Sequence, residues 1–380
     1  MDDERIIVAG GGPVGSALAL ALAAAGRAVT LLEARGGGTD DARALALAHG
    51  SRLLLERLGA WPNEDATPIE HITVSQRGGF GRVELTAAET GVPALGYVVA
   101  YGALQRALTR ALAASGVRVE RGCVALAVGG DGARATVTVE QANARREVHG
   151  RLAVVADGGA GLELARVRTH DYGQSALVCE VASREPYRYR AFERFTAEGP
   201  LALLPAGRSW SLVWTARTEH AAALEALEAD DFCRRLRETF GEALGEFSLC
   251  GQRQVFPLRL KVAERALAPR CVLIGNAAQT LHPVAGQGFN LGLRDAFELA
   301  RLAGLPDCAD PGAENMLKNF FAQRRFDRTA TILFTDSLIR LFSKDIPFLT
   351  PARGLGLAAL SVLPAARKFL ARRMMYGARG

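Results

Sequence analysis

The stretch RIIVAGGGPVGSALALALAAAGRAVTLLE, residues 5–33, has the pattern of a strand, a glycine-rich turn, a helix and a second strand. An apolar run at residues 5–9 stops at the first glycine, and the small apolar residues at 16–25 are typical of a buried helix. Gly26 ends that helix, and residues 28–32 predict the second strand. The stretch therefore predicts a βαβ unit, the building block of a doubly wound α/β fold.

The glycines of this turn are spaced as in units that bind dinucleotides. In the GxGxxG pattern, Gly10 makes the tight turn, Gly12 lets the backbone approach a pyrophosphate, and Gly15 lets the helix pack against the strand. Glu33 follows about 20 residues later, where a carboxylate reaches the free ribose of FAD or NAD and repels a 2′-phosphate. A glycine-rich turn that binds nothing is disfavoured, because the strand, the helix and the acid are all in place.

A second glycine-rich stretch, VLIGNAAQTLHPVAGQGFNLGLRD, covers residues 272–295. An apolar strand at residues 271–274 stops at a glycine, and helical spacing begins after Asn290. Between them, Gly286 and Gly288 allow the backbone to come close to a flat or anionic group. Taken alone, this stretch is equally consistent with an ordinary strand-to-helix turn.

The middle of the chain contains further strands. Residues 152–156 predict a strand that ends in Asp157, an acid that points into the ligand crevice of a doubly wound sheet unless it only forms a turn. Residues 117–140 predict a small antiparallel excursion. Four short strands and a helix follow without βαβ alternation, at residues 177–182, 190–195, 201–205, 210–214 and 230–240. They predict an α+β insertion with one sheet face free to cover a ligand.

Composition sets limits on the class of protein. With 380 residues, 49% hydrophobic and 23% charged, the chain is typical of a globular protein with one large or two ordinary domains. The net charge of +6 is a weak indication of an acidic partner, and the absence of a basic cluster interleaved with aromatic residues disfavours nucleic acid. Six scattered cysteines without a CxxC pair indicate reduced thiols in a cytoplasmic protein. The six histidines form no metal-binding spacing, so we expect no metal.

Together, these motifs resemble a known family. GGGPVG with Glu33, the DARALAL segment at residues 41–47, Asp157 followed by glycine, and GNAAQTLHPVAGQGFNLGLRD resemble the FAD-dependent aromatic hydroxylases of the para-hydroxybenzoate hydroxylase type. The segments AFERFTAEGPLALLP (191–205) and TDSLIRLF (335–342) resemble the ubiquinone-biosynthesis branch, which hydroxylates polyprenylated methoxyphenols. So does Asn276, which stands where most of the superfamily has Asp.

The resemblance implies the fold and its division. It implies an α/β protein in which a discontinuous Rossmann-like FAD-binding domain of the GR2 type consists of residues 1–75, 100–170 and 255–310. The inserted α+β substrate domain would consist of residues 76–99 and 171–254. A helical C-terminal region would cover residues 311–380.

The resemblance also implies a set of cofactor-binding residues. One group would hold the pyrophosphate, ribose and adenine of FAD, namely Gly10, Gly12, Val14, Gly15, Glu33, Arg35 and Asp157. A second group would contact the flavin ring and its ribityl phosphate chain, namely Arg43, Gln105, Asn276, Gly286, Gly288, Phe289 and Asn290. The family usually has a serine where this chain has Gly161, and the loop at residues 36–38 is shorter than usual.

The implied chemistry depends on the flavin. NADPH or NADH, bound transiently, would reduce FAD, and O2 would form a flavin C4a-hydroperoxide that hydroxylates the phenol. The catalytic residues stay unknown, and the pocket candidates are His282, Pro283 and Gln287. His282 could act as a base, but a histidine before proline is more often structural, and Trp210 and Trp214 are better explained as core residues.

Two alternatives to this function remain open. One is a flavoprotein hydroxylase that acts on another phenol. The other is a non-catalytic FAD-binding scaffold subunit of a ubiquinone-biosynthesis protein complex, which only the departure at Gly161 supports.

The tail predicts helices with breaks at Pro351, Gly354 and Pro364. The segment AARKFLARR at residues 365–373 is basic and amphipathic, which is typical of a contact with an anionic bilayer. A terminal helix docked on its own protein explains the same pattern. We therefore expect a cytoplasmic protein. Whether it also contacts the inner membrane peripherally is left open by the sequence.

Overall fold

The computed structural model describes residues 4–37, 43–159, 162, 164–185, 189–264, 266–342 and 349–379. Gly161, the first residues of the DARALAL segment and the end of the 36–38 loop lie outside the described residues. The expectations attached to them therefore have no structural counterpart here.

A six-stranded sheet contains the predicted βαβ unit. Its strands follow the order β19 (Leu267–Ala268), β20 (Cys271–Leu273), β12 (Leu152–Val155), β1 (Ile6–Ala9), β2 (Val29–Glu33) and β8 (Arg118–Arg121). All neighbours are parallel except β19 and β20, which confirms the expected α/β fold with a Rossmann-like parallel sheet. Three helices, α1 (Pro13–Ala24), α4 (Tyr101–Ala113) and α7 (Gln287–Ala303), share one apolar core with this sheet.

A small antiparallel sheet packs beside it. Its strands are β11 (Ala144–Gly150), β10 (Ala135–Gln141) and β9 (Cys123–Gly130). The sequence also placed residues 117–120 in this excursion, which is wrong. β8 instead pairs in parallel with β2 at the edge of the six-stranded sheet, where its mostly charged side chains stay exposed or half-buried.

A second large sheet, of nine strands, covers the ligand side of the molecule. Its path is β21 (Gln279–Thr280), β18 (Gln254–Ala263), β13 (Val167–Ser183), β16 (Ser209–Arg217), β15 (Gly199–Ala206), β14 (Arg190–Thr196), β5 (His71–Gln76) and β6 (Arg82–Thr86), with β17 (Phe247–Leu249) beside β13. One face buries α5 (Thr218–Ala226) and α6 (Ala229–Phe240) together with Trp210 and Trp214, which are core residues as expected. Because β5 and β18 belong to this sheet, we propose that the substrate domain begins before residue 76 and extends past residue 254.

A three-stranded sheet missing from the sequence prediction joins the two large ones. Its strands are β3 (Ala44–Ala48), β7 (Gly96–Ala100) and β4 (Ala66–Ile69), with α2 (His49–Arg57) and α3 (Ala87–Thr90) nearby. Short 3-10 turns complete the described backbone at Asn63–Asp65, Glu242–Leu244, Gly275–Ala277, Val284–Gly286 and Gly377–Arg379.

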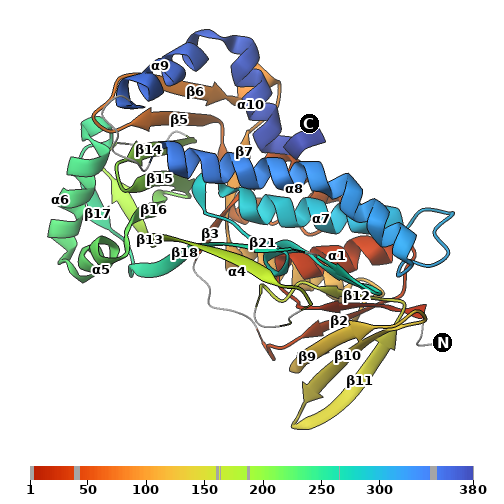
Figure 1. Cartoon of the computed structure of the whole chain (residues 1–380). Coiled ribbons are helices and arrows are strands. Elements are labelled where there is room, and N and C mark those ends of the chain that lie inside the picture. The colour runs from red at the N-terminus through yellow and green to blue at the C-terminus, as the bar shows by residue number, and fades with distance from the viewer. Residues whose placement is uncertain are drawn as a thin grey trace.

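Three C-terminal helices, α8 (Glu314–Phe342), α9 (Leu349–Val362) and α10 (Pro364–Tyr376), complete the fold. Figure 1 shows α8 running along α7, with α9 and α10 beyond β5 and β6. Pro351 and Gly354 lie within α9 and do not break it. Pro351 is in the first turn of that helix, where a proline needs no N–H partner. Of the predicted breaks, only Pro364 lies at a helix boundary. Arg324 of α8 bonds Asp295 of α7 at 2.6 Å in a buried ion cluster that fixes the two helices together.

The length and hydropathy of the C-terminal helices bear on whether the chain could cross a membrane. No single helix in the described ranges is both long and apolar enough to cross a bilayer. The bent pair Pro351–Val362 and Pro364–Tyr376, whose axes meet at 97°, satisfies length and composition only when taken together.

Candidate functional site

A cavity of about 1690 Å³ separates the carboxyl ends of the six-stranded sheet from the open face of the nine-stranded sheet. Its first part, here called the cofactor end, is lined by the turn after β1, the end of β2, the loop after β12 and the start of α7. Its second part, the apolar chamber, is lined by β5, β6, β14, β15, β16 and the helices α8 to α10. The two parts form one continuous space.

The glycine turn is shaped by contacts that leave no room for side chains. At Gly10, φ is +113° and an added Cβ would lie 2.5 Å from the carbonyl oxygen of Ala156. At Gly15 a Cβ would overlap the carbonyl oxygen of Gly10, so Gly15 lies behind the cavity wall. Gly12 differs, because a Cβ there would point into open space with only the Tyr101 hydroxyl at 3.8 Å. Gly12 and the uncapped start of α1 therefore face the cavity, as a pyrophosphate requires.

The acid at the end of β2 is held in its ionised form. Glu33 is 8% exposed and accepts hydrogen bonds from the backbone N–H of Arg35 at 2.8 Å and from its Nε at 2.9 Å. Burial acts to raise the pKa of Glu33, but the hydrogen bonds and charge of Arg35 outweigh it and the net pKa is lowered. Both side chains line the cofactor end, where an ionised carboxylate can accept ribose hydroxyls.

Gln105 supports this end without reaching the cavity. Its Nε2 donates to the carbonyl oxygen of Gly11 at 2.9 Å, and its side chain does not line the space. Gln105 therefore braces the glycine turn.

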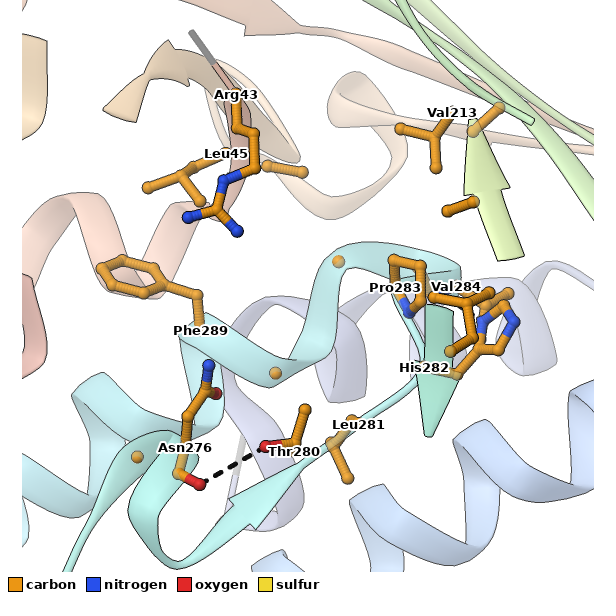
Figure 2. Close-up of a pocket in the computed structure, with 18 of the residues that line it drawn as sticks. Arg43, Leu45, Val213, Asn276, Thr280, Leu281, His282, Pro283, Val284 and Phe289 are labelled. Atoms are coloured by element: carbon orange, nitrogen blue, oxygen red, sulfur yellow. Dashed lines mark hydrogen bonds between the residues drawn. The ribbon is translucent and has the colours of Figure 1, made fainter. Parts of the chain in front are cut away.

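Asp157 and Asn276 lie on neighbouring loops of the cofactor end. The Oδ1 of Asp157 accepts the N–H of Gly159 at 2.8 Å, which fixes the loop after β12. The backbone oxygen of Asn276 accepts the hydroxyl of Thr280 at 3.4 Å. Figure 2 shows the amide of Asn276 and the guanidinium of Arg43 directed toward the cavity from opposite sides, beside Phe289.

Arg43 is positioned at the boundary between the two parts of the cavity. Its guanidinium carbon lies 5.7 Å from the ring centres of both Tyr101 and Phe256. These contacts hold the cation at the cavity wall, where it can meet an anionic or flat group.

The second glycine stretch forms a tight wall between β21 and α7. Ala285 has φ of +57°, an unfavourable conformation for a residue with a side chain, and Gly286 follows with φ of +60°. At Gly286 a Cβ would lie 2.9 Å from the Cβ of Ala46. Pro283, Gly286, Gly288 and Phe289 all line the cavity, so this backbone is exposed to a ligand at close range.

Asn290 lies behind that wall. Its Oδ1 accepts from the N–H of Ala48 at 2.8 Å and from the hydroxyl of Ser51 at 2.7 Å, while its Nδ2 donates to the oxygens of Ala46 and Gly286. The amide is thus fully used inside the protein, and it does not line the cavity. Its role is to fasten α7 to β3 and α2, which positions the loop of Gly286.

Gln287 also lies behind the wall. Its Nε2 donates to the oxygen of Ala285 at 3.2 Å and lies 3.5 Å from the oxygen of Met374. Like Asn290, it does not line the cavity, so it joins the start of α7 to α10.

His282 lines the cavity, but its geometry does not suit a base. The ring is 1% exposed and packs edge-on against Tyr172, and burial lowers the pKa of His282 to about 3. The neutral ring accepts the N–H of Val284 on Nδ1 at 3.1 Å, so its proton lies on Nε2. In this arrangement Nε2 can donate a hydrogen bond but cannot accept one.

The apolar chamber contains one acid that the sequence analysis missed. Glu193 lies on β14 and lines the cavity, and burial raises its pKa to about 7. The side chains two residues away on the same face are Ala191 and Phe195. That alternation was visible in AFERF, where an acid interrupts the apolar face of a predicted strand.

Comparisons with known proteins agree with the geometry of the cofactor end. The model of the FAD binding domain family matches residues 3–306. The chain is similar to ubiquinone hydroxylase UbiL of Rhodospirillum rubrum, at 36% identity over 97% of this chain and 89% of that protein. It is also similar to 3-demethoxyubiquinol 3-hydroxylase of Escherichia coli, at 30% identity over 93% of this chain and 94% of that protein.

A solved structure shares the fold. p-Nitrophenol 4-monooxygenase PnpA of Pseudomonas putida matches with a TM-score of 0.79 at 16% identity, covering 100% of this chain and 99% of that one. At this identity the match supports the architecture alone.

Proposed function

The chain belongs to the FAD binding domain family, and from this premise we propose that it is an FAD-dependent monooxygenase that hydroxylates a polyprenylated methoxyphenol in ubiquinone biosynthesis. The observation that carries the proposal is the single cavity, which joins a cofactor end built from glycines to a large apolar chamber. Two relatives support the pathway, since both are named as hydroxylases of ubiquinone or its precursors.

The cofactor end fits FAD. Gly10 and Gly12 provide a turn without side chains at the start of α1, and Glu33 provides an ionised carboxylate about one βαβ unit away. We propose that Arg43, Asn276 and the backbone at Gly286 border the flavin ring and its chain. When bound, FAD would supply the redox chemistry, using electrons from NADPH or NADH and O2 as the oxidant.

The apolar chamber suits a phenol with a long apolar tail. The cavity is larger than the roughly 300–1,000 Å³ of an ordinary small-molecule site, so it has room for two ligands end to end. Residues such as Ile72, Val74, Leu85 and Leu204 would exclude water from the reacting ring and hold it in one orientation.

The far side of the chamber reaches the C-terminal helices. Leu360 and Phe369 line the cavity, and Phe369 is 63% exposed, so the chamber wall extends to the molecular surface at α10. Residues 349–380 contain six Arg or Lys and no Asp or Glu. We propose that this face contacts an anionic bilayer from which the polyprenyl substrate enters, on the cytoplasmic side of the inner membrane.

Participation in a complex of ubiquinone-biosynthesis proteins is a further proposal, supported only by the pathway named for the relatives. The alternative of a different phenol is retained, because the described chamber wall is mostly hydrocarbon and suits other apolar phenols as well.

Product analysis tests the function directly. Purified holoenzyme is incubated with NADPH, isotopically labelled O2 and a short-chain prenyl methoxyphenol, and the products are identified by mass spectrometry. We expect a ring-hydroxylated product that carries one labelled oxygen atom. NADPH oxidation with no labelled product would contradict the proposal, and a labelled product from an unprenylated phenol alone would favour the alternative.

A further inference from the structure

Glu193 lies in the middle of the chamber-facing side of the nine-stranded sheet. Across the sheet it pairs with Val74 on β5 and with Ala202 on β15. Along its own strand, Ala191 and Phe195 occupy the same face. All four neighbours are apolar and all line the cavity, so the carboxyl group is surrounded by hydrocarbon and directed at the ligand space.

Glu193 is half-buried in the open cavity, and its Oε1 is fully buried and unpaired among the described residues. Within the described ranges, no donor lies within hydrogen-bond distance of its buried Oε1. The fully buried acids are paired, for example Glu33 with Arg35 and Asp295 with Arg324. A buried polar atom without a partner costs about 1–3 kcal/mol, so an acid that stabilises nothing in the fold indicates a partner supplied by a ligand.

We propose that Glu193 binds the phenolic hydroxyl of the substrate and accepts its proton during hydroxylation, an inference that rests on the proposed function. In this step the phenolic O–H bond breaks and an O–H bond forms on a carboxylate oxygen, while the phenol oxygen keeps the electron pair. No oxidation or reduction is involved. The ring becomes richer in electrons, which favours attack by an electrophilic oxygen, and the proton returns to the product.

The surroundings of Glu193 suit such a transfer. Its pKa of about 7, raised by burial, lets the group change protonation near neutral pH, where a general base is most effective. From the elements packed around the chamber, the facing titratable or charged groups are His282 after β21 and Arg353 on α9. The remainder lie at the cofactor end, namely Glu33, Arg35, Arg43, Tyr101, Cys123 and Asp157.

Arg353 is a cation and cannot accept a proton, and neither His282 nor Thr215 suits this role. His282 carries its proton on Nε2, because Nδ1 is occupied by the N–H of Val284. Thr215 has a buried hydroxyl oxygen without a partner in the described structure and lines the same sheet face. A hydroxyl group can bind a phenol but cannot hold its proton at neutral pH, which makes Thr215 the matched control position.

A binding experiment isolates the contact with the hydroxyl group. Holoenzyme without NADPH is titrated calorimetrically, at about pH 8, with a short-chain prenyl methoxyphenol and with its phenolic methyl ether. We expect the wild type to prefer the phenol by about tenfold or more, as for a hydrogen bond to a charged group. Glu193→Leu should reduce the ratio to about one, whereas Thr215→Val and the exposed control Glu225→Gln should keep it. A ratio that survives in Glu193→Leu, or one lost only in Thr215→Val, would overturn the proposal.

Steady-state kinetics test whether Glu193 accepts the proton of the phenol. Glu193→Gln keeps the size of the side chain, and we expect kcat to fall by about a hundredfold with a smaller change in KM. The kcat/KM of the wild type should rise with pH through about 7, and that of Glu193→Gln should not. Wild-type kcat in the Gln variant would refute the role of Glu193 while leaving the function intact. Wild type that binds the phenol with the expected ratio but never hydroxylates it would refute the function instead.

Discussion

The cofactor end and the apolar chamber share one cavity but are built in different ways. At the cofactor end, backbone and glycines form the surface, and polar side chains such as Glu33 and Asn290 are paired within the protein. In the chamber, side chains from strands far apart in the sequence form the surface, and Glu193 is left unpaired. The cofactor end is therefore preorganised for a ligand whose shape is fixed, whereas the chamber leaves its specific interaction to the substrate.

The largest effect is expected at Gly10. Gly10→Ala places a Cβ 2.5 Å from the oxygen of Ala156 at a φ of +113°, so it should destabilise the fold by roughly 3 kcal/mol or more. Chemical denaturation of the apoprotein measures this loss. Gly129→Ala is the control, since a Cβ at Gly129 meets nothing within 4 Å and should change stability little.

Gly12→Ala tests whether the space beside Gly12 is occupied by the ligand, without disturbing the fold. Its Cβ meets only the Tyr101 hydroxyl at 3.8 Å, so we expect near-normal stability with FAD affinity lowered by about tenfold or more, because the methyl group occupies ligand space. Normal FAD binding by Gly12→Ala would show that the pyrophosphate lies elsewhere.

Asn290 tests whether the flavin-side wall depends on its internal hydrogen bonds. Asn290→Ala removes the partners of the Ala48 N–H and the Ser51 hydroxyl in a buried site, which should cost about 2–3 kcal/mol of folding free energy. Thermal unfolding measures the cost. The exposed Asn319, changed to Ala, should have little effect. A variant of Asn290 with normal stability but no bound FAD would instead indicate a direct contact with the cofactor.

The contrast between the two parts of the cavity also explains why the cofactor end could be predicted from the sequence more fully than the chamber. The βαβ unit depends on contacts close in sequence, such as the turn at Gly10 and the acid Glu33, so local pattern predicted both its fold and its ligand class. The motif did not distinguish residues that line the cavity from those that brace it. Gln105 and Asn290 differ from Asn276 only in which way the folded chain turns their amides.

The chamber could be predicted only as a free sheet face. Its floor depends on β14 pairing in parallel with β5, more than 100 residues earlier in the chain, and no local pattern specifies that partner. Glu193 was readable as an acid on an apolar strand face. That Glu193 and Pro283 line the same cavity could be known only from the tertiary structure. In Figure 2, Val213, which pairs with the Glu193 neighbour Ala202, faces Pro283 and Val284.

A smaller effect is expected where the chamber meets the surface. Lys368 and Arg372 are exposed one turn apart on α10, on either side of Phe369. Each basic residue near an anionic surface contributes about 1 kcal/mol, so Lys368→Glu with Arg372→Glu should lower binding to phosphatidylglycerol vesicles by at least about tenfold. Flotation measures this, with neutral vesicles and the α6 pair Arg234→Glu with Arg235→Glu as controls. Flotation equal to the wild type would remove the membrane role of α10.

The smallest expected effect is on the pH dependence of folding stability, which compares Glu193 with Glu33. The pKa of Glu193 is raised from 4.5 to about 7, so ionisation disfavours the folded state and wild-type stability falls as pH rises through that range. Glu193→Leu should therefore match the wild type near pH 4.5 and be more stable by about 1 kcal/mol or more at about pH 8, with cavity water reducing the full linkage value. The pKa of Glu33 is lowered, so its contribution is present above 4.5 and lost as pH falls. Glu33→Gln should consequently be destabilised at about pH 8 and approach the wild type in acid, measured by urea unfolding at both pH values. If both variants shifted in the same direction, the two ends of the cavity would not differ in how they satisfy their buried charge.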